Sequence, residues 1–432
     1  MRVSAILTRV EGEGEVQLII KDGSLIGVNV KITEPPRFFE YLVKGRRAID
    51  VPDIVSRICG ICGVSYILTA VRAFEKGLGI TPSEEVEKLR LAILGAERVK
   101  SHILHAYYLH LPDFFNASSL PELVDRNPLL FNSASRTLLW SRKAMEVLGG
   151  RFHNVVNIRV GGVYGFPKLD KAVKLLKEMP EVLKSFKYMA DVVLSLENIP
   201  MDEQDLKLMA VYDGSTYPCI ADNIYVSHSS EEKLVPLGDF EKIVRCEQAD
   251  YSNALRYKLI DGLEYVVGPL ARFNVGYRHL SSESKELLNS YGWRPPLKNI
   301  FQSIIARVVE TYDTLIYLRD FLENYREPST SPTCERIEPT PGTYIAATEA
   351  PRGILYHRYE VDDLGRIKYS NIVTPTAQNQ ASMEAIIMRM LKDAALNMER
   401  AVETAKRVIR AFDPCISCSV HSIKVESRSV DA

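Results

Sequence analysis

Residues 57–62 read Arg-Ile-Cys-Gly-Ile-Cys, and residues 413–418 read Asp-Pro-Cys-Ile-Ser-Cys. Each segment carries two cysteines three positions apart, yet the segments stand near opposite ends of a chain of 432 residues. Thiolates are ligands for soft metals, and this spacing presents two sulfurs from one turn of the backbone. A centre that uses both pairs therefore requires a fold that brings the two ends together, and it exists only in the folded protein.

The cysteine pairs alone leave two kinds of metal site open. One is a structural zinc site, because four-cysteine zinc is the commonest use of such pairs. Structural zinc usually closes a segment of about 12 to 20 residues, whereas Cys62 and Cys415 are separated by most of the chain. The other is a metal centre whose ligands come from both ends of the chain and meet only in the complete fold.

The composition is that of a soluble globular protein, with 46% hydrophobic and 25% charged residues. Lys and Arg number 54 and Asp and Glu 55, so the net charge gives no reason to expect binding to nucleic acid or to an anionic membrane. The first nine residues contain only three consecutive apolar ones, and no run approaches the roughly 18 that a membrane span needs. We therefore expect a cytoplasmic protein without a direct membrane span. The odd number of cysteines, seven, argues against a disulfide framework.

Hydrophobic periodicity predicts an α+β fold that is mainly helical. Residues 2–33 alternate apolar and polar side chains around Asp22-Gly23, which predicts an antiparallel meander. Thr81-Pro82-Ser83-Glu84 predicts the start of a long helix toward Leu111. Further helices are expected at 133–148, on both sides of Pro180 between about 169 and 196, at 297–325 and at 382–412. A hairpin is expected at 354–359 and 367–373, and irregular segments at 201–230 and 327–343. We expect one domain over residues 1–432, with a core of long bundled helices, a small N-terminal antiparallel sheet and a C-terminal hairpin.

Three further segments accompany the cysteine pairs: Arg9-Val10-Glu11-Gly12, Thr348-Glu349-Ala350-Pro351-Arg352-Gly353 and Thr374-Pro375-Thr376. Together with the cysteine segments, the second of which extends to His421, they resemble in content and order the motifs of nickel-iron hydrogenase large (alpha) subunits. The resemblance covers essentially the whole chain. It looks closest to the alpha subunits of soluble archaeal hydrogenases and sulfhydrogenases.

The resemblance implies a role for each paired cysteine. The first cysteine of each pair would be a terminal nickel ligand, and the second would bridge nickel to iron. Cys59 and Cys415 are therefore expected to be terminal, and Cys62 and Cys418 to be bridging. Soft thiolates suit such metals.

The resemblance also assigns residues around the cysteines. Iron would carry carbon monoxide and cyanide, and Pro351, Arg352 and Thr376 match the positions that line their pocket. Heterolytic cleavage of dihydrogen needs a base for the proton, and Glu11 matches the family's proton-transfer glutamate. Arg352 could hold a second base position or only tether the cyanide side, and both remain open. Asp113 matches a carboxylate that pairs with an active-site arginine, although the end of a helix would also explain it.

A second cation, magnesium or another iron, is implied near the carboxy terminus, where Glu40 and His421 match its ligands. Without this context Glu40 is more simply a salt-bridge partner and His421 a core histidine. One position departs from the family: Tyr66 stands where a histidine usually follows the first cysteine pair. A phenol can donate a hydrogen bond to sulfur, but its unperturbed pKa near 10 prevents it from switching charge near neutral pH. Packing around the outer shell, rather than metal binding, is expected of His102, His105 and His110.

Beyond His421 the sequence continues from Ser422 to Ala432. The resemblance to hydrogenase precursors implies that a maturation endopeptidase removes residues 422–432 after nickel-insertion factors have loaded the site. The mature chain would then comprise residues 1–421. A frayed tail is the alternative.

The expected activity follows from these implications. The chain would be the catalytic subunit of a soluble nickel-iron hydrogenase that reversibly splits dihydrogen into protons and electrons. The sequence has no further cysteine cluster for an iron-sulfur relay and no Gly-x-Gly-x-x-Gly after a strand. Electrons are therefore expected to leave through an iron-sulfur small subunit, with flavin- or NAD(P)-binding subunits that reduce NAD(P), deazaflavin or polysulfide.

Three alternatives are open. Energy-converting, membrane-associated hydrogenases often end the second signature with arginine, so His421 favours the soluble type. A relative of the quinone module of respiratory complex I would have lost the metal, and the four cysteines argue against that. A zinc-stapled assembly protein without redox activity is the third.

Overall fold

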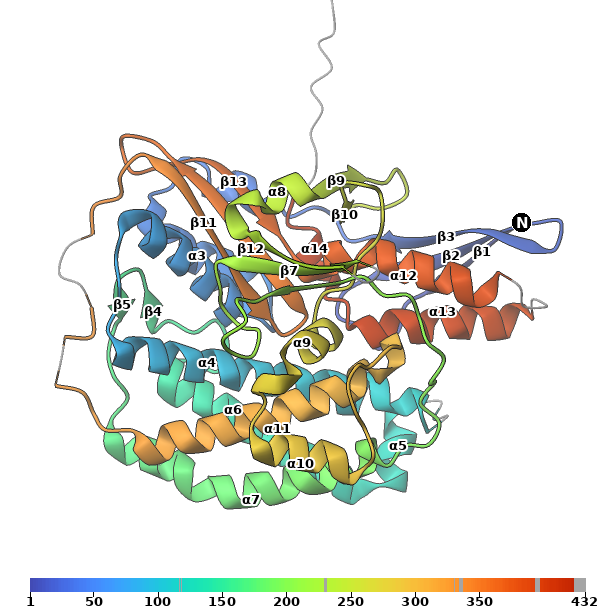
Figure 1. Cartoon of the computed structure of the whole chain (residues 1–432), viewed down its shortest axis with the longest axis horizontal. Coiled ribbons are helices and arrows are strands. Elements are labelled where there is room, and N and C mark those ends of the chain that lie inside the picture. Colours follow the sequence, from blue (N-terminus) through green and yellow to red (C-terminus); the bar gives the residue numbers. More distant parts are fainter. Residues whose placement is uncertain are drawn as a thin grey trace, which may run out of the picture.

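The computed structural model describes residues 1–115, 117, 119–228, 231–329, 331–333, 337–392 and 397–422. The architecture is mainly helical α+β, as predicted. Long helices fill the lower half of Figure 1, and small antiparallel sheets lie above them. A continuous core of buried apolar side chains connects the two halves and includes the four paired cysteines.

Four long helices form the bundle: α4 (Glu84–Ile103), α6 (Pro128–Gly149), α7 (Leu169–Leu194) and α11 (Ser303–Asn324). Helix α4 packs on α6 and α11, and α7 packs on the same two helices. The predicted helices at 133–148 and 297–325 are thus confirmed. Helix α6 begins earlier than predicted, because the side chain of Asn127 caps it by accepting the Leu130 amide. The helical segments expected on the two sides of Pro180 form one helix, α7, which continues through Pro180.

Helix α4 begins two residues later than the sequence predicts. Ser83, rather than Thr81, caps it, and the Ser83 hydroxyl accepts the Val86 amide at 3.4 Å. The helix then widens into a π-helical turn over Leu104–His110 and tightens into a 3-10 turn over Leu111–Asp113. The predicted end near Leu111 is confirmed.

The N-terminal sheet consists of β1 (Arg2–Ile6), β2 (Gly14–Lys21) and β3 (Ser24–Ile32), paired antiparallel in that order. This confirms the predicted meander. Alternate residues of β2 and β3, such as Val16, Leu18 and Val30, are buried. Their burial fixes the register and so positions the β1–β2 connection that contains Glu11.

A second antiparallel sheet consists of β11 (Gly342–Ala350), β12 (Gly353–Val361) and β13 (Ile367–Val373). The predicted hairpin is β12 with β13, and β11 is an additional strand. Residues 346–350 of β11 are all buried, so the strand shows no apolar–polar alternation. Helix α3 (Gly63–Leu78) packs on β11 and β12, which brings the first cysteine pair to the β11–β12 turn.

The prediction of an irregular segment at 201–230 is wrong. It contains β6 (Leu208–Val211) and β7 (Asn223–His228), which pair with β8 (Glu231–Pro236). Beside this sheet, β9 (Val244–Gln248) pairs with β10 (Leu255–Leu259), and α8 (Phe240–Ile243) places the Phe240 ring on Tyr356 in a second apolar core. Such short strands leave little periodicity in the sequence. The described residues from 327 to 341 form no helix or strand, in agreement with prediction.

The predicted helix at 382–412 is two helices, α12 (Pro375–Leu391) and α13 (Met398–Phe412). The other short elements are β4 (Ile158–Arg159), β5 (Gly162–Val163), α1 (Phe39–Val43), α2 (Val51–Val55), α5 (Leu120–Arg126), α9 (Pro269–Gly276), α10 (Ser282–Ser290) and α14 (Ile416–Ser419), with 3-10 turns at Ala48–Asp50, Ser56–Ile58, Leu237–Asp239, Tyr277–His279 and Ile300–Gln302.

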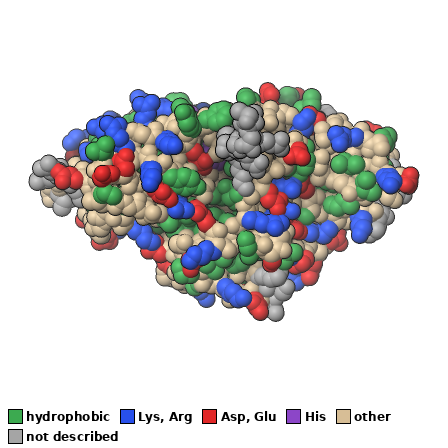
Figure 2. Space-filling model, turned by 90° about the horizontal axis from the view of Figure 1, so that it is seen from above, with side chains coloured by type: hydrophobic (Ala, Val, Ile, Leu, Met, Phe, Trp, Pro, Cys, Tyr) green, Lys and Arg blue, Asp and Glu red, His purple; other side chains and the backbone are tan. Residues whose placement is uncertain are grey.

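No helix in the described part of the chain combines the length and apolarity needed to cross a bilayer. Figure 2 shows basic and acidic side chains interspersed over the face seen from above. This distribution agrees with the near equality of the two kinds of charge in the sequence.

Candidate metal centre

The four paired cysteines meet at one point in the interior. Cys59 follows the 3-10 turn Ser56–Ile58, and Cys62 immediately precedes α3. The Sγ atoms of all four lie within 4.8 Å of one another, and none of the four residues is more than 4% exposed. The sulfurs are 2.7 Å apart within each pair, and Cys59 lies 3.5 Å from Cys415. The fold therefore assembles a compact, dry set of four soft ligands.

The proton affinities of these thiols differ strongly. Burial opposes ionisation of Cys59, but hydrogen bonds from the other thiols, together with the charge of Arg352, lower its pKa well below the usual value. Burial and the hydrogen bond with Cys418 raise the pKa of Cys415 well above it. One negative charge on the cluster thus suppresses the next ionisation. A metal cation, which replaces protons on the sulfurs, would remove this conflict.

Glu11 ties the N-terminal sheet to the second cysteine pair. Its backbone forms a parallel bridge with Cys415, and its carbonyl accepts the Ile416 amide at 3.0 Å. Its Oε2 accepts the Ser417 amide at 3.1 Å, and the residue is half-buried. Gly12 makes this approach possible: its φ is +86°, and a Cβ there would lie 2.7 Å from the Ile416 Cβ.

Arg352 lies in the turn between β11 and β12 and faces the sulfurs. Its Nη1 is 3.8 Å from Cys62 Sγ, while Nε and Nη2 donate to the carbonyl and Oδ1 of Asp413 at 2.8 and 3.0 Å. Burial disfavours the guanidinium charge, but Asp413 and the cysteines raise the Arg352 pKa well above its usual value. Arg352 is therefore a fixed positive charge beside the cluster.

Thr376 contacts the second cysteine pair, and Pro351 belongs to the turn that carries Arg352. Thr376, in the first turn of α12, accepts the Cys415 amide on Oγ1 at 2.9 Å. The Pro351 carbonyl accepts from Arg272 at 2.9 Å, and both residues are buried. These contacts hold the β11–β12 turn and the second cysteine pair in place.

Asp113 pairs with two arginines, Arg410 and Arg9. Arg410 donates to its two carboxylate oxygens at 2.7 and 2.9 Å, and Arg9 donates to one of them. Although burial opposes its charge, the bonds from Arg410 lower the Asp113 pKa. Asp113 thus anchors the segment that precedes Glu11 to helix α13.

Glu40 and His421 are brought together on the far side of the second cysteine pair. His421 Nδ1 lies 2.7 Å from the Cys418 carbonyl, and its Nε2 lies 2.6 Å from the Ile372 carbonyl and 3.6 Å from Glu40 Oε1. If Nδ1 carries the ring proton and donates to the Cys418 carbonyl, Nε2 would be available as a ligand beside the Ile372 carbonyl and Glu40 Oε1. Ser422 donates to the other oxygen of Glu40. The donor set suits a hard cation.

Tyr66 is buried against the cluster, 1% exposed, with its ring centroid 5.8 Å from that of His357. Burial and the charges of the cysteines, Cys418 most of all, raise its pKa well above the usual value. The Oη atom has no hydrogen-bond partner among the described residues. A buried hydroxyl of this kind needs a partner, and a bound group between the sulfurs would provide one.

Three functional candidates escape sequence reasoning. In the sequence Asp413 is only a neighbour of the second cysteine pair. In the structure it forms ion pairs with Arg352 and, at 3.3 Å, with Arg307. Arg307 and Glu97, described below, carry no local motif. The signal for Asp413 was its place two residues before Cys415.

The histidines of the long helix pack inside the protein, as expected. His102 donates to Glu310 at 2.7 Å and accepts from Arg307 at 3.4 Å, and burial lowers its pKa to about 4. His105 bonds to the Arg410 carbonyl. Of the cysteines outside the two Cys-x-x-Cys segments, Cys219 and Cys246 are half-buried, and Cys334 lies outside the described residues.

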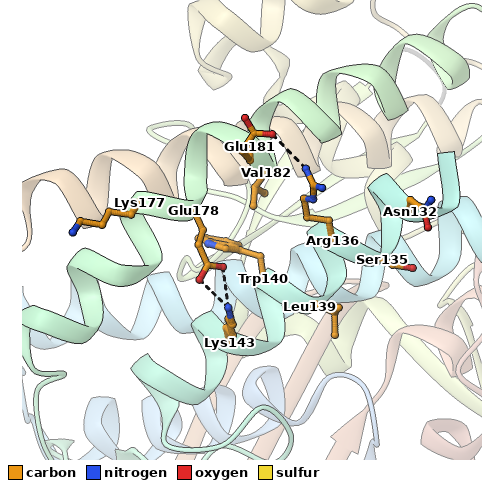
Figure 3. Close-up of a pocket in the computed structure, with 10 residues that line it drawn as sticks. All are labelled: Asn132, Ser135, Arg136, Leu139, Trp140, Lys143, Lys177, Glu178, Glu181 and Val182. Carbon is orange, nitrogen blue, oxygen red and sulfur yellow. Dashed lines mark hydrogen bonds and ion pairs between the residues drawn. The ribbon is translucent and has the colours of Figure 1, made fainter. Parts of the chain in front are cut away.

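The groove shown in Figure 3 lies apart from this centre, between α6 and α7. Its volume is about 820 Å³, and ion pairs of Arg136 with Glu181 and of Lys143 with Glu178 cross it. None of the residues proposed for the metal centre lines it. The centre is a closed interior site rather than a surface pocket.

Comparison with known proteins agrees with this geometry. The family model described as nickel-dependent hydrogenase matches residues 37–166 and 204–421. Sulfhydrogenase 2 subunit alpha of Pyrococcus furiosus is 32% identical over 427 residues, which cover 97% of this chain and 98% of the relative. The NAD-reducing hydrogenase HoxS subunit beta of Cupriavidus necator is 24% identical, with 96% and 94% coverage. A solved NAD+-reducing NiFe hydrogenase in the H2-reduced state shares the fold, with a TM-score of 0.87, 23% identity and coverage of 98% and 99%.

Proposed function

The chain belongs to the nickel-dependent hydrogenase family, as a catalytic large subunit, and we propose that it reversibly splits dihydrogen at a nickel-iron centre. The convergence of four cysteine sulfurs within 4.8 Å carries this proposal. Cys59 and Cys415 would be terminal nickel ligands, and Cys62 and Cys418 would bridge to iron. When bound, the centre, with carbon monoxide and cyanide on iron, would supply the chemistry that polarises dihydrogen.

Arg352 would orient rather than accept protons. The charges of Asp413 and the cysteines keep its guanidinium protonated, and its N–H groups are fixed next to Cys62. A rigid, charged donor suits the tethering of cyanide on the iron side. Pro351 and Thr376 would line the same pocket, because one belongs to the turn of Arg352 and the other binds the Cys415 amide.

Glu11 would take the proton and pass it outward. Its carboxylate accepts the amide of Ser417, which lies between the two cysteines of the second pair, and the residue is half-buried. A carboxylate in this position can exchange protons with the interior and with the surface. Asp113 supports it indirectly by holding Arg9 two residues earlier.

A hard cation, magnesium or a second iron, would bind between Glu40 and His421. The Ile372 carbonyl converges on the same place and would be a third ligand. Oxygen atoms and one imidazole nitrogen are the appropriate donors. The cation would anchor the segment that follows Cys418.

We further propose that the chain is one domain whose residues 422–432 are removed by a maturation endopeptidase after nickel-insertion factors have acted. The mature chain of residues 1–421 would work with an iron-sulfur small subunit. Electron-transfer subunits with flavin and NAD(P) sites would complete the complex, because the relatives are named as subunits of sulfhydrogenase and of NAD-reducing hydrogenase. NAD(P), deazaflavin or polysulfide would be the acceptor, and the cytoplasm the location.

Metal analysis and infrared spectroscopy of the chain purified with its partner subunits test the proposal. We expect nickel equimolar with the chain, bands of carbon monoxide and cyanide on iron, and dihydrogen-dependent dye reduction. Cys418→Ser should abolish all three, whereas Cys219→Ser, a substitution at a half-buried thiol outside the cluster, should leave them intact. Equimolar zinc without the infrared bands would overturn the proposal in favour of a stapled assembly protein.

A further inference from the structure

Glu97 is a completely buried carboxylate that lies beneath the first cysteine pair. It belongs to α4, and its relative exposure is 0%. Its Oε2 accepts the Val64 amide at 2.7 Å, and its Oε1 accepts both the amide and the hydroxyl of Ser65, at 3.0 and 2.6 Å. Three hydrogen bonds on one buried carboxylate make it a strong anchor.

The hydrogen bonds that Glu97 accepts take the place of a side-chain N-cap on helix α3. Cys62 occupies the N-cap position, but its side chain makes no capping hydrogen bond. The first amides of a helix lack partners within the helix and are usually satisfied by the capping side chain. Here a carboxylate from another helix does so, which leaves the Cys62 sulfur free for the cluster. Its negative charge also lies at the positive end of the α3 dipole.

The loop between the two cysteines is fixed at the same time. Cys59 Sγ accepts the amides of Ile61 and Cys62 at 3.3 and 3.1 Å. On the helix side, a Cβ at Gly63 would lie only 2.9 Å from Asn154 Oδ1 and 3.1 Å from the Ser56 carbonyl. The loop therefore has little freedom, and its direction depends on the turn that Glu97 holds.

Glu11 makes a related contact at the second pair. It accepts the amide of Ser417, which lies between Cys415 and Cys418 at the start of α14, whereas Glu97 accepts the amides of Val64 and Ser65 after Cys62, at the start of α3. At each cysteine pair, a carboxylate from a remote element thus binds backbone amides of the adjoining helical turn. The two anchors differ in burial, because Glu11 is half-buried and Glu97 is completely enclosed.

Electrostatics link Glu97 to the cysteines. Burial raises its pKa to about 7; the charge of Lys100, one turn along α4, opposes this rise, and the charge of Cys59 adds to it. Lys100 is itself 5% exposed, and burial lowers its pKa. The charge of Cys59 therefore reaches Glu97 through an interior that screens it weakly.

We propose that Glu97 is a positioning residue of the metal centre, which directs the Cys59 and Cys62 sulfurs through the first turn of α3 and tunes them by its charge. The proposal rests on the function proposed above. It predicts that changing this one carboxylate alters the electronic state of the centre without removing a ligand.

Glu97→Gln tests this, because glutamine keeps the size of the side chain but sets an amide N–H2 group against backbone donors. We expect nickel to remain equimolar, the carbon monoxide and cyanide bands to shift, and kcat for dihydrogen oxidation to fall roughly 10- to 100-fold. Hydrogen exchange at the Val64 and Ser65 amides should accelerate. Glu384→Gln is the matched control: Glu384 also accepts a backbone amide, of Val30 at 2.9 Å, and a hydroxyl, of Tyr251 at 2.7 Å, but in α12. The infrared bands of the Glu384→Gln variant should coincide with those of the wild type.

A milder variant keeps the inference testable if Glu97→Gln does not fold. Ser65→Ala removes only the 2.6 Å bond to Glu97 and should shift the bands less, in the same direction. Unshifted bands in Glu97→Gln, or in Ser65→Ala if Glu97→Gln does not fold, would overturn the inference. A wild-type protein without any such bands would instead overturn the proposed function, so the two failures are distinguishable.

Discussion

Asp413 holds Arg352 at two points: its backbone carbonyl accepts from Nε at 2.8 Å, and its Oδ1 accepts from Nη2 at 3.0 Å. Asp413 ends α13 in the left-handed conformation, with φ 58° and ψ 57°, two residues before Cys415. One residue thus fixes the guanidinium and the second cysteine pair relative to each other.

Asp413→Asn should remove the negative charge of this side chain while keeping the backbone conformation of the turn. Asparagine tolerates the left-handed conformation, but it leaves Arg352 and Arg307 without their shared counter-charge. We expect the rate of dihydrogen oxidation to fall roughly 10- to 100-fold while nickel content stays unchanged, as measured by dye reduction and metal analysis. Asp213→Asn, at an exposed aspartate that also accepts a backbone amide, is the control. A wild-type rate in Asp413→Asn would show that the charge is dispensable.

Thr376→Val should weaken the second cysteine pair. Valine has nearly the same shape but cannot accept the Cys415 amide, and an unsatisfied buried amide costs about 1 to 3 kcal/mol. We expect a lower thermal unfolding midpoint and faster hydrogen exchange at Cys415. Thr376→Ser keeps the oxygen and should behave like the wild type. Equal midpoints for the valine and serine variants would mean that the hydrogen bond contributes nothing.

Glu40→Gln should remove the hard cation selectively. The substitution takes away the one carboxylate of the proposed set, so magnesium or the second iron should drop below equimolar amounts while nickel is retained. Elemental analysis of purified protein measures both metals. Glu360→Gln, at a glutamate of β12 bound to Arg358, is the control. Unchanged magnesium and iron contents would place the cation elsewhere.

Stability should fall on acidification because of His102. Burial lowers its pKa to about 4 in the folded state, with smaller contributions from the charges of Arg307 and Arg272 and against the opposing effect of Glu310. Only the unfolded state therefore takes up a proton between about pH 6.5 and pH 4. The contribution of neutral His102 is complete above pH 6.5 and is lost as the pH falls toward 4. His102→Gln cannot titrate, so the difference in unfolding midpoint between wild type and variant should shrink over this range. It should stay constant between pH 7 and pH 8, and constancy at every pH would contradict the prediction.

Active protein should end at His421. Removal of residues 422–432 frees the Glu40 oxygen that Ser422 occupies in the uncleaved chain, which would complete the ligand set of the hard cation. Intact mass spectrometry of the active complex measures the chain length directly. An active preparation that still carries Ser422 to Ala432 would rule out processing as a requirement.

Much of the fold follows from the sequence where periodicity is long. The β1–β3 meander and helices α4, α6, α7 and α11 repeat their apolar spacing often enough to be recognised. The strands β6–β8 are short and β11 is buried on both faces, so neither shows a readable pattern. At the start of α4 the pattern of Thr81, Pro82 and Glu84 predicts Thr81 as the cap, whereas Ser83 caps the helix in the structure.

The residues of the candidate site also differ in how well the sequence predicts them. The cysteines, Arg352 and Thr376 stand in motifs, and the fold brings them together. Glu97 and the Arg307 contact to Asp413 leave no trace in the sequence, because their partners lie 32 to 33 and about 106 positions away. The partners of Asp113 also depend on three-dimensional proximity, since several arginines could have reached it.

The bridge between Glu11 and Cys415 bears on the order of events during synthesis. A ribosome releases residue 11 long before residue 415, so a nascent chain carries half of its sulfur ligands, unpartnered, through almost the whole of translation. Nickel and iron delivered together would find their complete coordination sphere only after the second pair emerges. The complete set of four thiol ligands can therefore assemble only after almost the whole chain has been synthesised.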